Sequence, residues 1–259
     1  MKALRFGRSA ALLSVAALAL TACGGNDGGN ASSGSSEGGT VGGTLIGGGA
    51  SSQESALTAW ADGVKSVAPE LTVQYSPDGS GAGREGFLGG AFSFAGSDAA
   101  LKEDEAEQAR QFCGDNGAFH VPAYISPIAV AFNLEGVDEV KMDAETIAKV
   151  FSKEITTWND PAIAQQNEGV ELPDTAITVV HRSDDSGTTE NFTAYLTEAA
   201  GDAWKYDEVE TWPSEITAES AQGTRGVVGQ AAQTDGAITY ADASAVGELG
   251  TVSVKVGEE

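Results

Sequence analysis

The sequence predicts an α/β fold with largely parallel sheets. Short apolar segments, such as Leu71-Thr72-Val73-Gln74-Tyr75, alternate with glycine- and serine-rich loops and with segments of helical periodicity. Chains that repeat strand, loop and helix in this order build sheets whose strands run mostly in one direction. Ligands of such folds bind where the strands end, so we expect the functional residues in the loops that follow the strands.

The predicted elements follow from apolar runs and from apolar residues that recur three and four positions apart. A helix is also expected where Asp160 precedes Pro161, because an acceptor side chain followed by proline is a favoured helix start. The predicted strands cover residues 44–46, 71–75, 91–94, 119–124, 128–134, 176–180 and 237–240. The predicted helices lie around residues 57–64, 87–88, 103–112, 147–151, 190–196 and 224–233.

The first 22 residues have the pattern of a secretory signal peptide. A basic start with Lys2, Arg5 and Arg8 precedes an apolar stretch, residues 10–20, that is too short to span a bilayer. The segment ends in Leu20-Thr21-Ala22-Cys23, which resembles the lipobox of bacterial lipoproteins. This resemblance implies cleavage before Cys23 and attachment of lipid, such as palmitate, to that residue. The alternative is an ordinary secretory signal that happens to be followed by a cysteine.

Three further regions follow the signal peptide. Residues 23–43 consist mainly of Gly, Ser, Asn and Thr, so we expect a flexible tether. The remainder is long enough for two lobes, which we place at residues 44–132 and 133–259. Outside the signal peptide no stretch of the sequence is long and apolar enough to cross a bilayer. We therefore expect a protein held by its lipid on the extracytoplasmic face of the cell membrane.

The charge of the chain is strongly negative. It has 14 Lys and Arg against 38 Asp and Glu, a formal net charge of −24. Such a charge argues against nucleic acid and against anionic membrane surfaces as partners. It does not argue against a small anion, because distant surface charge is screened beyond about 8 Å at physiological salt. Local donors can therefore dominate the potential inside a site.

Residues 181–189 carry anion-binding chemistry between a predicted strand and a predicted helix. Ser186, Gly187 and Thr188 lie where the helix begins, so their N–H groups, two hydroxyls and the positive end of the helix dipole can face an anion. Arg182 adds a planar fork of donors that suits a phosphate or carboxylate edge. The same residues are also compatible with a capped helix beside a surface arginine.

Similar chemistry recurs at other predicted strand ends. Glycine in such loops lets a ligand approach the backbone closely. Each loop alone is weak evidence, because glycine and serine are common in turns. Their repetition at successive strand ends is more specific. The residues concerned are Ser51 with Ser52, Ser80 with Gly81, Asp98, and Arg182 with Ser186, Gly187 and Thr188.

Several motifs together resemble one known family between residues 43 and 240. The motifs are Gly47-Gly48-Gly49-Ala50-Ser51, Gly79-Ser80-Gly81, Phe94-Ala95-Gly96-Ser97-Asp98, Ile128-Ala129-Val130-Ala131-Phe132-Asn133-Leu134, Ile155-Thr156-Thr157-Trp158-Asn159-Asp160, Arg182-Ser183-Asp184-Asp185-Ser186-Gly187-Thr188 and Gly236-Ala237-Ile238-Thr239-Tyr240. The chain is similar to the phosphate-binding lipoproteins of bacterial phosphate ABC transporters, the PstS family. The resemblance implies a two-lobe fold of the type II periplasmic binding proteins, with a ligand cleft between the lobes.

The resemblance also implies a ligand and partners. By position, the phosphate ligands of the family correspond to Ser51, Ser52, Ser80, Asp98, Arg182, Ser186, Gly187 and Thr188. Asp184 is expected to hold Arg182 in place. The implied partners are inorganic phosphate and the transmembrane permease subunits of the transporter. The chain departs from the family at Ser52, where an aromatic residue is frequent, and at Asp185, where glycine is common and a carboxylate now lies near the site.

Asp98 is the most informative of these residues. A carboxylate beside an anion is repulsive unless the anion carries a proton that the two can share. Phosphate at neutral pH does so and sulfate does not, so Asp98 predicts rejection of sulfate. On its own, an aspartate in this position is also compatible with a turn or a helix cap.

Other functions receive less support from the sequence. A receptor for another oxyanion, such as sulfate or molybdate, is the nearest alternative. A secreted hydrolase is disfavoured because no Gly-x-Ser-x-Gly elbow follows any of the predicted strands. Residues 81–86 match Gly-x-Gly-x-x-Gly, but a lone match is weak evidence for a dinucleotide. Two histidines and one spare cysteine predict no metal cluster. We therefore expect a binding protein with no catalytic residues and no cofactor.

The resemblance further implies that family members continue beyond Glu259 and return to the first lobe. We therefore expect an incomplete second lobe and an incomplete return to lobe I. If Cys23 carries lipid, Cys113 is left without a partner in this sequence, which is unexpected in an oxidising compartment. The resemblance implies that Cys113 forms a disulfide with a later cysteine in a longer chain.

Overall fold

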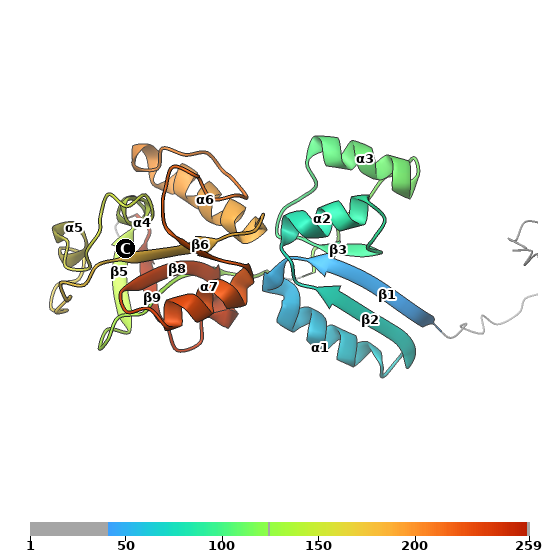
Figure 1. Cartoon of the computed structure of the whole chain (residues 1–259), viewed down its shortest axis with the longest axis horizontal. Coiled ribbons are helices and arrows are strands. Elements are labelled where there is room, and N and C mark those ends of the chain that lie inside the picture. Colours follow the sequence, from blue (N-terminus) through green and yellow to red (C-terminus); the bar gives the residue numbers. More distant parts are fainter. Residues whose placement is uncertain (1–40, 124, 258–259) are drawn as a thin grey trace, which may run out of the picture. The chain divides into compact units, whose positions relative to one another are not determined.

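The computed structural model describes residues 41–123 and 125–257 (Figure 1). The predicted signal peptide, Cys23 and most of the predicted tether lie outside the described residues. Within the described part, no helix has both the length and the apolar character needed to cross a membrane. The first strand begins at Gly42, so the last two residues of the predicted tether belong to a sheet.

A parallel three-stranded sheet forms the first part of the fold, which we call lobe I (residues 42–113). Its strands are β1 (Gly42–Gly49), β2 (Glu70–Ser76) and β3 (Phe94–Gly96), in the order β2-β1-β3. The helices of lobe I are η1 (Ser51–Gln53), α1 (Glu54–Val64), α2 (Ser80–Leu88) and α3 (Glu103–Cys113). Each loop from a strand into a helix therefore leaves the same edge of the sheet.

Glycines allow β3 and α2 to pack closely against β1. A Cβ on Gly49 would lie 1.9 Å from the carbonyl oxygen of Gly96, and a Cβ on Gly83 would lie 2.4 Å from the Cα of Gly49. Gly49 also has a φ of +140°, which residues with a side chain rarely adopt. These contacts bring the start of α2 and the end of β3 against the end of β1.

A mixed six-stranded sheet forms the second part of the fold, lobe II (residues 128–255). Its strands are β4 (Ile128–Phe132), β5 (Glu139–Asp143), β6 (Thr178–Arg182), β7 (Glu219–Ala221), β8 (Ala237–Asp242) and β9 (Gly250–Lys255), in the order β5-β9-β4-β8-β6-β7. β4 runs antiparallel to β8 and β9, whereas β6 is parallel to β7 and β8. The expectation of largely parallel strands therefore holds for lobe I, and lobe II is mixed. Residues 128–132, which the sequence placed at the end of lobe I, pair within the second sheet.

Lobe II contains most of the buried core among the described residues. Seven buried aromatic side chains belong to this core: Phe132, Phe151, Trp158, Phe192, Trp204, Trp212 and Tyr240. The helices that cover the sheet are α4 (Ala144–Phe151), α5 (Pro161–Ala164), α6 (Gly187–Ala199), η2 (Gly201–Ala203), α7 (Gly223–Ala232) and η3 (Ala243–Ala245). α5 begins as the sequence predicts, with Asp160 accepting the Ala162 N–H at 2.9 Å.

The connection between the lobes differs from its prediction. Residues 119–123 form no strand, although the apolar pattern predicted one over 119–124; Tyr124 itself lies outside the described residues. Phe119 is 86% exposed, and Val121 and Ile125 are exposed as well. No sheet edge among the described residues pairs with this segment, and an apolar run forms a strand only when a neighbouring strand satisfies its backbone groups.

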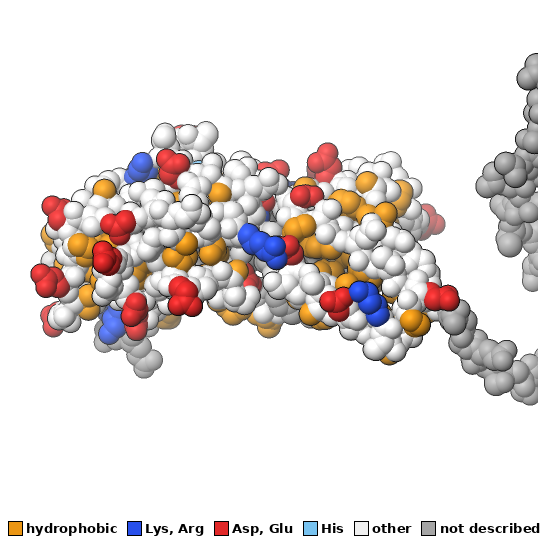
Figure 2. Space-filling view, turned by 60° about the horizontal axis from the view of Figure 1, so that its bottom comes forward, with side chains coloured by type: hydrophobic (Ala, Val, Ile, Leu, Met, Phe, Trp, Pro, Cys, Tyr) orange, Lys and Arg blue, Asp and Glu red, His pale blue; other side chains and the backbone are white. Residues whose placement is uncertain are grey.

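Acidic side chains are spread over the face of the molecule shown in Figure 2, on lobe II in particular. This agrees with the net charge of −24. The arginine side chains described next are instead buried, so their interactions with nearby carboxylates are little screened by salt.

Candidate functional site

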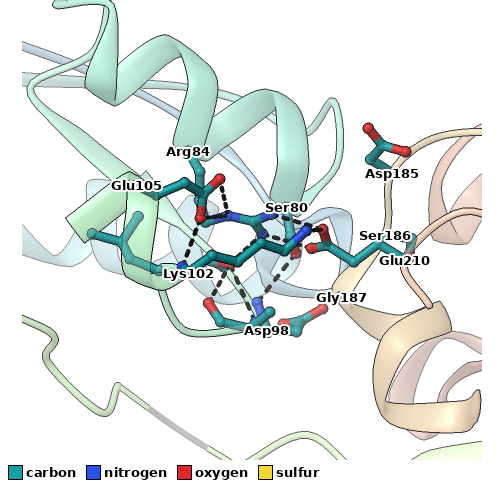
Figure 3. A network of polar contacts seen from close by, with 12 residues as sticks. Ser80, Arg84, Asp98, Lys102, Glu105, Asp185, Ser186, Gly187 and Glu210 are labelled. Atoms are coloured by element: carbon teal, nitrogen blue, oxygen red, sulfur yellow. Dashed lines mark hydrogen bonds and ion pairs between the residues drawn. The ribbon is translucent and has the colours of Figure 1, made fainter. Parts of the chain in front are cut away.

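The structure brings the loops of both lobes together at one polar site. Ser52 of η1, Ser80 at the start of α2 and Asp98 after β3 come from lobe I. Gly187 and Thr188 come from the first turn of α6 in lobe II. Figure 3 shows Ser80, Asp98 and Gly187 close to one another, together with charged side chains of both lobes. Strand ends and helix N-termini thus converge, as the sequence pattern indicated.

Asp98 is the centre of these contacts. Its two carboxylate oxygens lie 2.7 and 2.8 Å from the hydroxyl of Ser52, which donates to them, and one of them accepts a hydrogen bond from the hydroxyl of Thr188 at 3.2 Å. Its backbone N–H donates to the hydroxyl of Ser80 at 3.2 Å. Asp98 therefore joins three of the predicted site residues directly.

The environment of Asp98 shifts the pKa of its carboxyl upward. Burial raises the pKa of the Asp98 carboxyl above its ordinary value, and the nearby Asp242 acts in the same direction. Hydrogen bonds from Ser52 and Thr188 and the charge of Arg182 oppose the rise without cancelling it. A carboxyl group with such a pKa is suited to share a proton with a protonated ligand.

Arg182 ends β6 and is only 2% exposed. Its Nε donates to Asp184 Oδ1 at 2.8 Å, and its Nη2 forms an ion pair with Asp184 Oδ2. Its Nη1 lies 3.5 Å from the hydroxyl of Thr188, at the edge of the site. Burial alone would raise the pKa of the Asp184 carboxyl, but the hydrogen bonds and charge of Arg182 outweigh it and hold that pKa below its ordinary value. The pair therefore stays ionised and fixes the guanidinium.

The first turn of α6 supplies backbone donors to the site. Ser186 caps the helix, since its hydroxyl oxygen accepts the Thr189 N–H at 3.2 Å. The N–H groups of a helix's first turn have no acceptor inside the helix and carry its positive partial charge. A Cβ on Gly187 would lie 2.8 Å from both the Asp98 Cβ and the Ser80 hydroxyl oxygen. Glycine is therefore what allows this helix end to reach the residues of lobe I.

Ser51 occupies a different position from the other predicted ligands. Its hydroxyl oxygen accepts the Thr224 N–H at 2.9 Å and lies 3.0 Å from the Thr224 hydroxyl. Ser51 thus binds the first turn of α7 in lobe II. Ser186 also uses its hydroxyl within the protein, as the cap of α6. The remaining predicted ligands lie around Asp98 and Arg182.

Asp185 and the glycine loop of lobe I face each other closely. The N–H of Gly81 donates to the carbonyl oxygen of Asp185 at 3.2 Å, and a Cβ on Gly81 would lie 2.6 Å from the Asp185 Cβ. The Asp185 carboxylate accepts a hydrogen bond from the hydroxyl of Thr211, and Figure 3 shows it apart from the Asp98 cluster. The extra carboxylate therefore does not point at the site.

Sequence reasoning missed several residues of this region. Gly223 and Thr224 begin α7 beside the site, and the Gly223 N–H donates to Asp184 at 3.0 Å. The Gly-Thr pair at the start of a predicted helix repeats the pattern of Gly187 and Thr188, so a search for this dipeptide finds both. The hydroxyl of Tyr240, which accepts the Arg182 N–H at 3.3 Å, had no comparable signal.

A pocket of about 1100 Å³ opens beside the site. Ser52, Asp98 and Thr188 line one part of it, and apolar side chains such as Phe87 and Phe119 line another. This volume is far greater than a tetrahedral oxyanion needs, so the polar cluster is only one end of the space. Within the described residues, no group of three or more His, Cys, Asp and Glu side chains is placed to hold a metal ion.

The fold and the site together define a class: α/β binding proteins that hold a ligand at the strand ends of two sheets. The chain belongs to the PBP superfamily, whose domain model matches residues 34–257. The phosphate-binding protein PstS 3 of Mycobacterium tuberculosis (strain ATCC 25618 / H37Rv) is 39% identical over 246 residues, which cover 93% of this chain and 66% of that protein. PstS 3 of Mycobacterium leprae (strain TN) is 38% identical over 247 residues, with the same coverage. The chain thus spans 66% of the length of these relatives.

One solved structure supports the fold independently. A phosphate-binding protein from Stenotrophomonas maltophilia superposes with a TM-score of 0.63 and 22% identity, covering 82% of this chain and 64% of that one. At this identity the likeness concerns the architecture of the two lobes.

Proposed function

We propose that this chain is an extracytoplasmic receptor that binds inorganic phosphate and delivers it to an ABC importer. The observation that carries the proposal is the environment of Asp98, a buried carboxyl group surrounded by hydroxyls, a buried arginine and the start of a helix. Donors alone would suit any oxyanion. A proton acceptor among them suits an anion that carries a proton.

The geometry supports the proposed ligand set. The guanidinium of Arg182, the hydroxyls of Ser52, Ser80 and Thr188, and the first N–H groups of α6 donate to phosphate oxygens. Asp98 accepts the proton of the phosphate hydroxyl. Ser51 and Ser186 hold the two helix starts around the anion, Ser51 through Thr224 and Ser186 as a cap. In this proposal no residue of the set is catalytic and no cofactor takes part.

The location and partners of the receptor are part of the same proposal. Lipid on Cys23 would anchor the protein outside the cytoplasm, and the permease subunits of the importer would receive the anion. The relatives named as phosphate-binding proteins support phosphate as the anion delivered. A net charge of −24 makes nucleic acid an unfavourable partner.

Isothermal titration calorimetry with phosphate, arsenate and sulfate tests the proposal. Phosphate and arsenate share tetrahedral shape and a proton at neutral pH, so both should bind with one-to-one stoichiometry. Sulfate should give no heat of binding under the same conditions. Equal affinities for sulfate and phosphate would instead make the protein a general oxyanion receptor, and absence of heat with all three anions would refute the proposal.

A further inference from the structure

A cluster of charged side chains crosses from one lobe to the other beside the proposed site (Figure 3). Arg84 of α2 in lobe I is 3% exposed. Its Nη1 and Nη2 each lie 2.8 Å from one carboxylate oxygen of Glu210, which belongs to the loop between η2 and β7 in lobe II. Lys102 Nζ of lobe I lies 2.7 Å from Glu210 Oε2. The Glu210 carboxylate therefore forms ion pairs with two basic side chains of the opposite lobe.

Arg84 is also held from within its own lobe. Its Nε donates to the two carboxylate oxygens of Glu105 at 3.1 and 3.0 Å. The guanidinium is therefore oriented by Glu105 before it meets Glu210. The hydrogen bond from Nη2 to Glu210 and the second close ion-pair contact through Nη1 fix the direction of the guanidinium, so the pair sets one register between the lobes.

Both ends of this ion pair are connected to the anion site. Arg84 lies one helical turn after Ser80, on the same face of α2. On the other side, the backbone carbonyl oxygen of Glu210 accepts the N–H of Ser186 at 3.1 Å, and Ser186 caps α6. The Arg84–Glu210 pair thus connects the start of α2 with the start of α6, which face each other at Ser80 and Gly187.

The site residues on either side of this contact are buried. Ser80, Arg182, Ser186 and Thr188 expose almost none of their surface. Separating the lobes at this point would uncover an anion held among them. Any such movement at the starts of α2 and α6 also separates Arg84 from Glu210.

We propose that Arg84 and Glu210 form a latch between the lobes that retains the bound anion. They are positioning residues, because they touch the helix starts and not the proposed ligand. The inference rests on the proposed function, since the anion taken to be retained is phosphate. Opening the lobes breaks this buried ion pair, and the free energy that this requires slows release.

Kinetics of phosphate binding by the full chain test the latch. Glu210→Gln keeps the shape of the side chain and removes its charge. We expect phosphate dissociation to be about tenfold faster and association to change by less than about twofold, because loss of a buried charge pair acts on dissociation. Glu154→Gln is the matched control, as it removes an exposed ion pair with Lys205 inside lobe II. It should leave both rates unchanged.

A double-mutant cycle separates the latch from two independent defects. Arg84→Met, Glu210→Gln and the double variant are compared by their phosphate Kd values. If the residues act as a pair, the double variant binds no more weakly than the weaker single variant. Effects that multiply would overturn the latch. If Arg84→Met or Glu210→Gln fails to fold, Lys102→Met replaces that variant, since the Lys102 side chain is 57% exposed. Lys102→Met should raise the phosphate dissociation rate by about two- to threefold. An unchanged dissociation rate would overturn the latch.

Hydrogen exchange without phosphate distinguishes failure of the latch from failure of the proposed function. Glu210→Gln in lobe II should accelerate amide exchange in α2 of lobe I, whereas Glu154→Gln should not. Unmodified protein that binds no phosphate refutes the proposed function, and the exchange of α2 still tests the contact. The latch alone is refuted if the unmodified protein binds phosphate, Glu210→Gln leaves amide exchange in α2 unchanged, and the two substitutions act independently in the double-mutant cycle.

Discussion

Gly187 and Asp98 approach each other so closely that a Cβ on Gly187 would lie 2.8 Å from the Asp98 Cβ. They are separated by nearly ninety positions in the sequence and belong to different lobes. Their contact brings the positive end of α6 to a carboxyl group of lobe I. The proposed site therefore depends on the absence of one side chain.

Gly187→Ala should weaken phosphate binding by at least about tenfold, because the added methyl group separates the start of α6 from Asp98 and Ser80. Calorimetric titration measures the effect. Gly229→Ala, within α7, is the control, since a Cβ there meets no atom within 4 Å. It should bind normally and gain about 0.5–1 kcal/mol in free energy of unfolding. Normal binding by Gly187→Ala would show that the two lobes need not meet at this point.

Asp98→Asn should narrow the difference in affinity between phosphate and sulfate. The amide removes the repulsion of a fully ionised anion and loses the acceptor for the phosphate proton. Competition titrations with both anions measure the ratio, and Asp202→Asn on the exposed surface of lobe II serves as the control. An unchanged ratio in Asp98→Asn would assign selectivity to other residues.

Asp98 should also make stability depend on pH in a definite direction. Folding raises the pKa of this carboxyl, so the folded state holds its proton more tightly than the unfolded state. The resulting penalty is absent below the ordinary aspartate pKa of about 4 and grows as pH rises through the raised pKa. Without phosphate, Asp98→Asn should therefore gain stability relative to the unmodified protein between pH 4 and pH 7. Urea unfolding at both pH values measures this, and a relative loss at pH 7 would contradict it.

Arg182→Ala should weaken phosphate binding by about 2–4 kcal/mol, because it removes a buried charged donor and leaves Asp184 without its partner. Arg225→Ala is a suitable control, since that side chain is exposed and pairs with Glu54 outside the site. Arg84 is unsuitable as a control, because its side chain is buried in ion pairs with Glu105 and Glu210. Equal losses in Arg182→Ala and Arg225→Ala would indicate a general charge effect.

Cys23→Ser should release the protein from the membrane or leave its signal peptide uncleaved, because serine cannot carry the thioether-linked lipid. Membrane fractionation and the mass of the mature chain measure both outcomes. Cys113→Ser is the control, as Cys113 is an exposed free cysteine outside the tether. A correctly cleaved Cys23→Ser protein that stays with the membrane would contradict the lipid anchor.

The sequence by itself determined the local features of this protein. Apolar runs indicated most strands, Asp160 and Pro161 marked the start of α5, and Ser186 to Thr188 marked the start of α6. These features depend on neighbours within a few positions, where periodicity and capping chemistry are directly visible. The same local chemistry singled out Asp98 and Arg182 as site candidates.

Only the tertiary structure decided which of these features meet. β4 joins the second sheet antiparallel to β8, and residues 119–123 remain outside any sheet. Thr224 binds Ser51 from 173 positions away, and Glu210 meets Arg84 from 126 positions away. Periodicity reports which face of an element is buried and carries no information about its partner. Partners are chosen by how whole sheets and helices pack, and in that packing the absent side chains of Gly49, Gly81 and Gly187 matter as much as any donor.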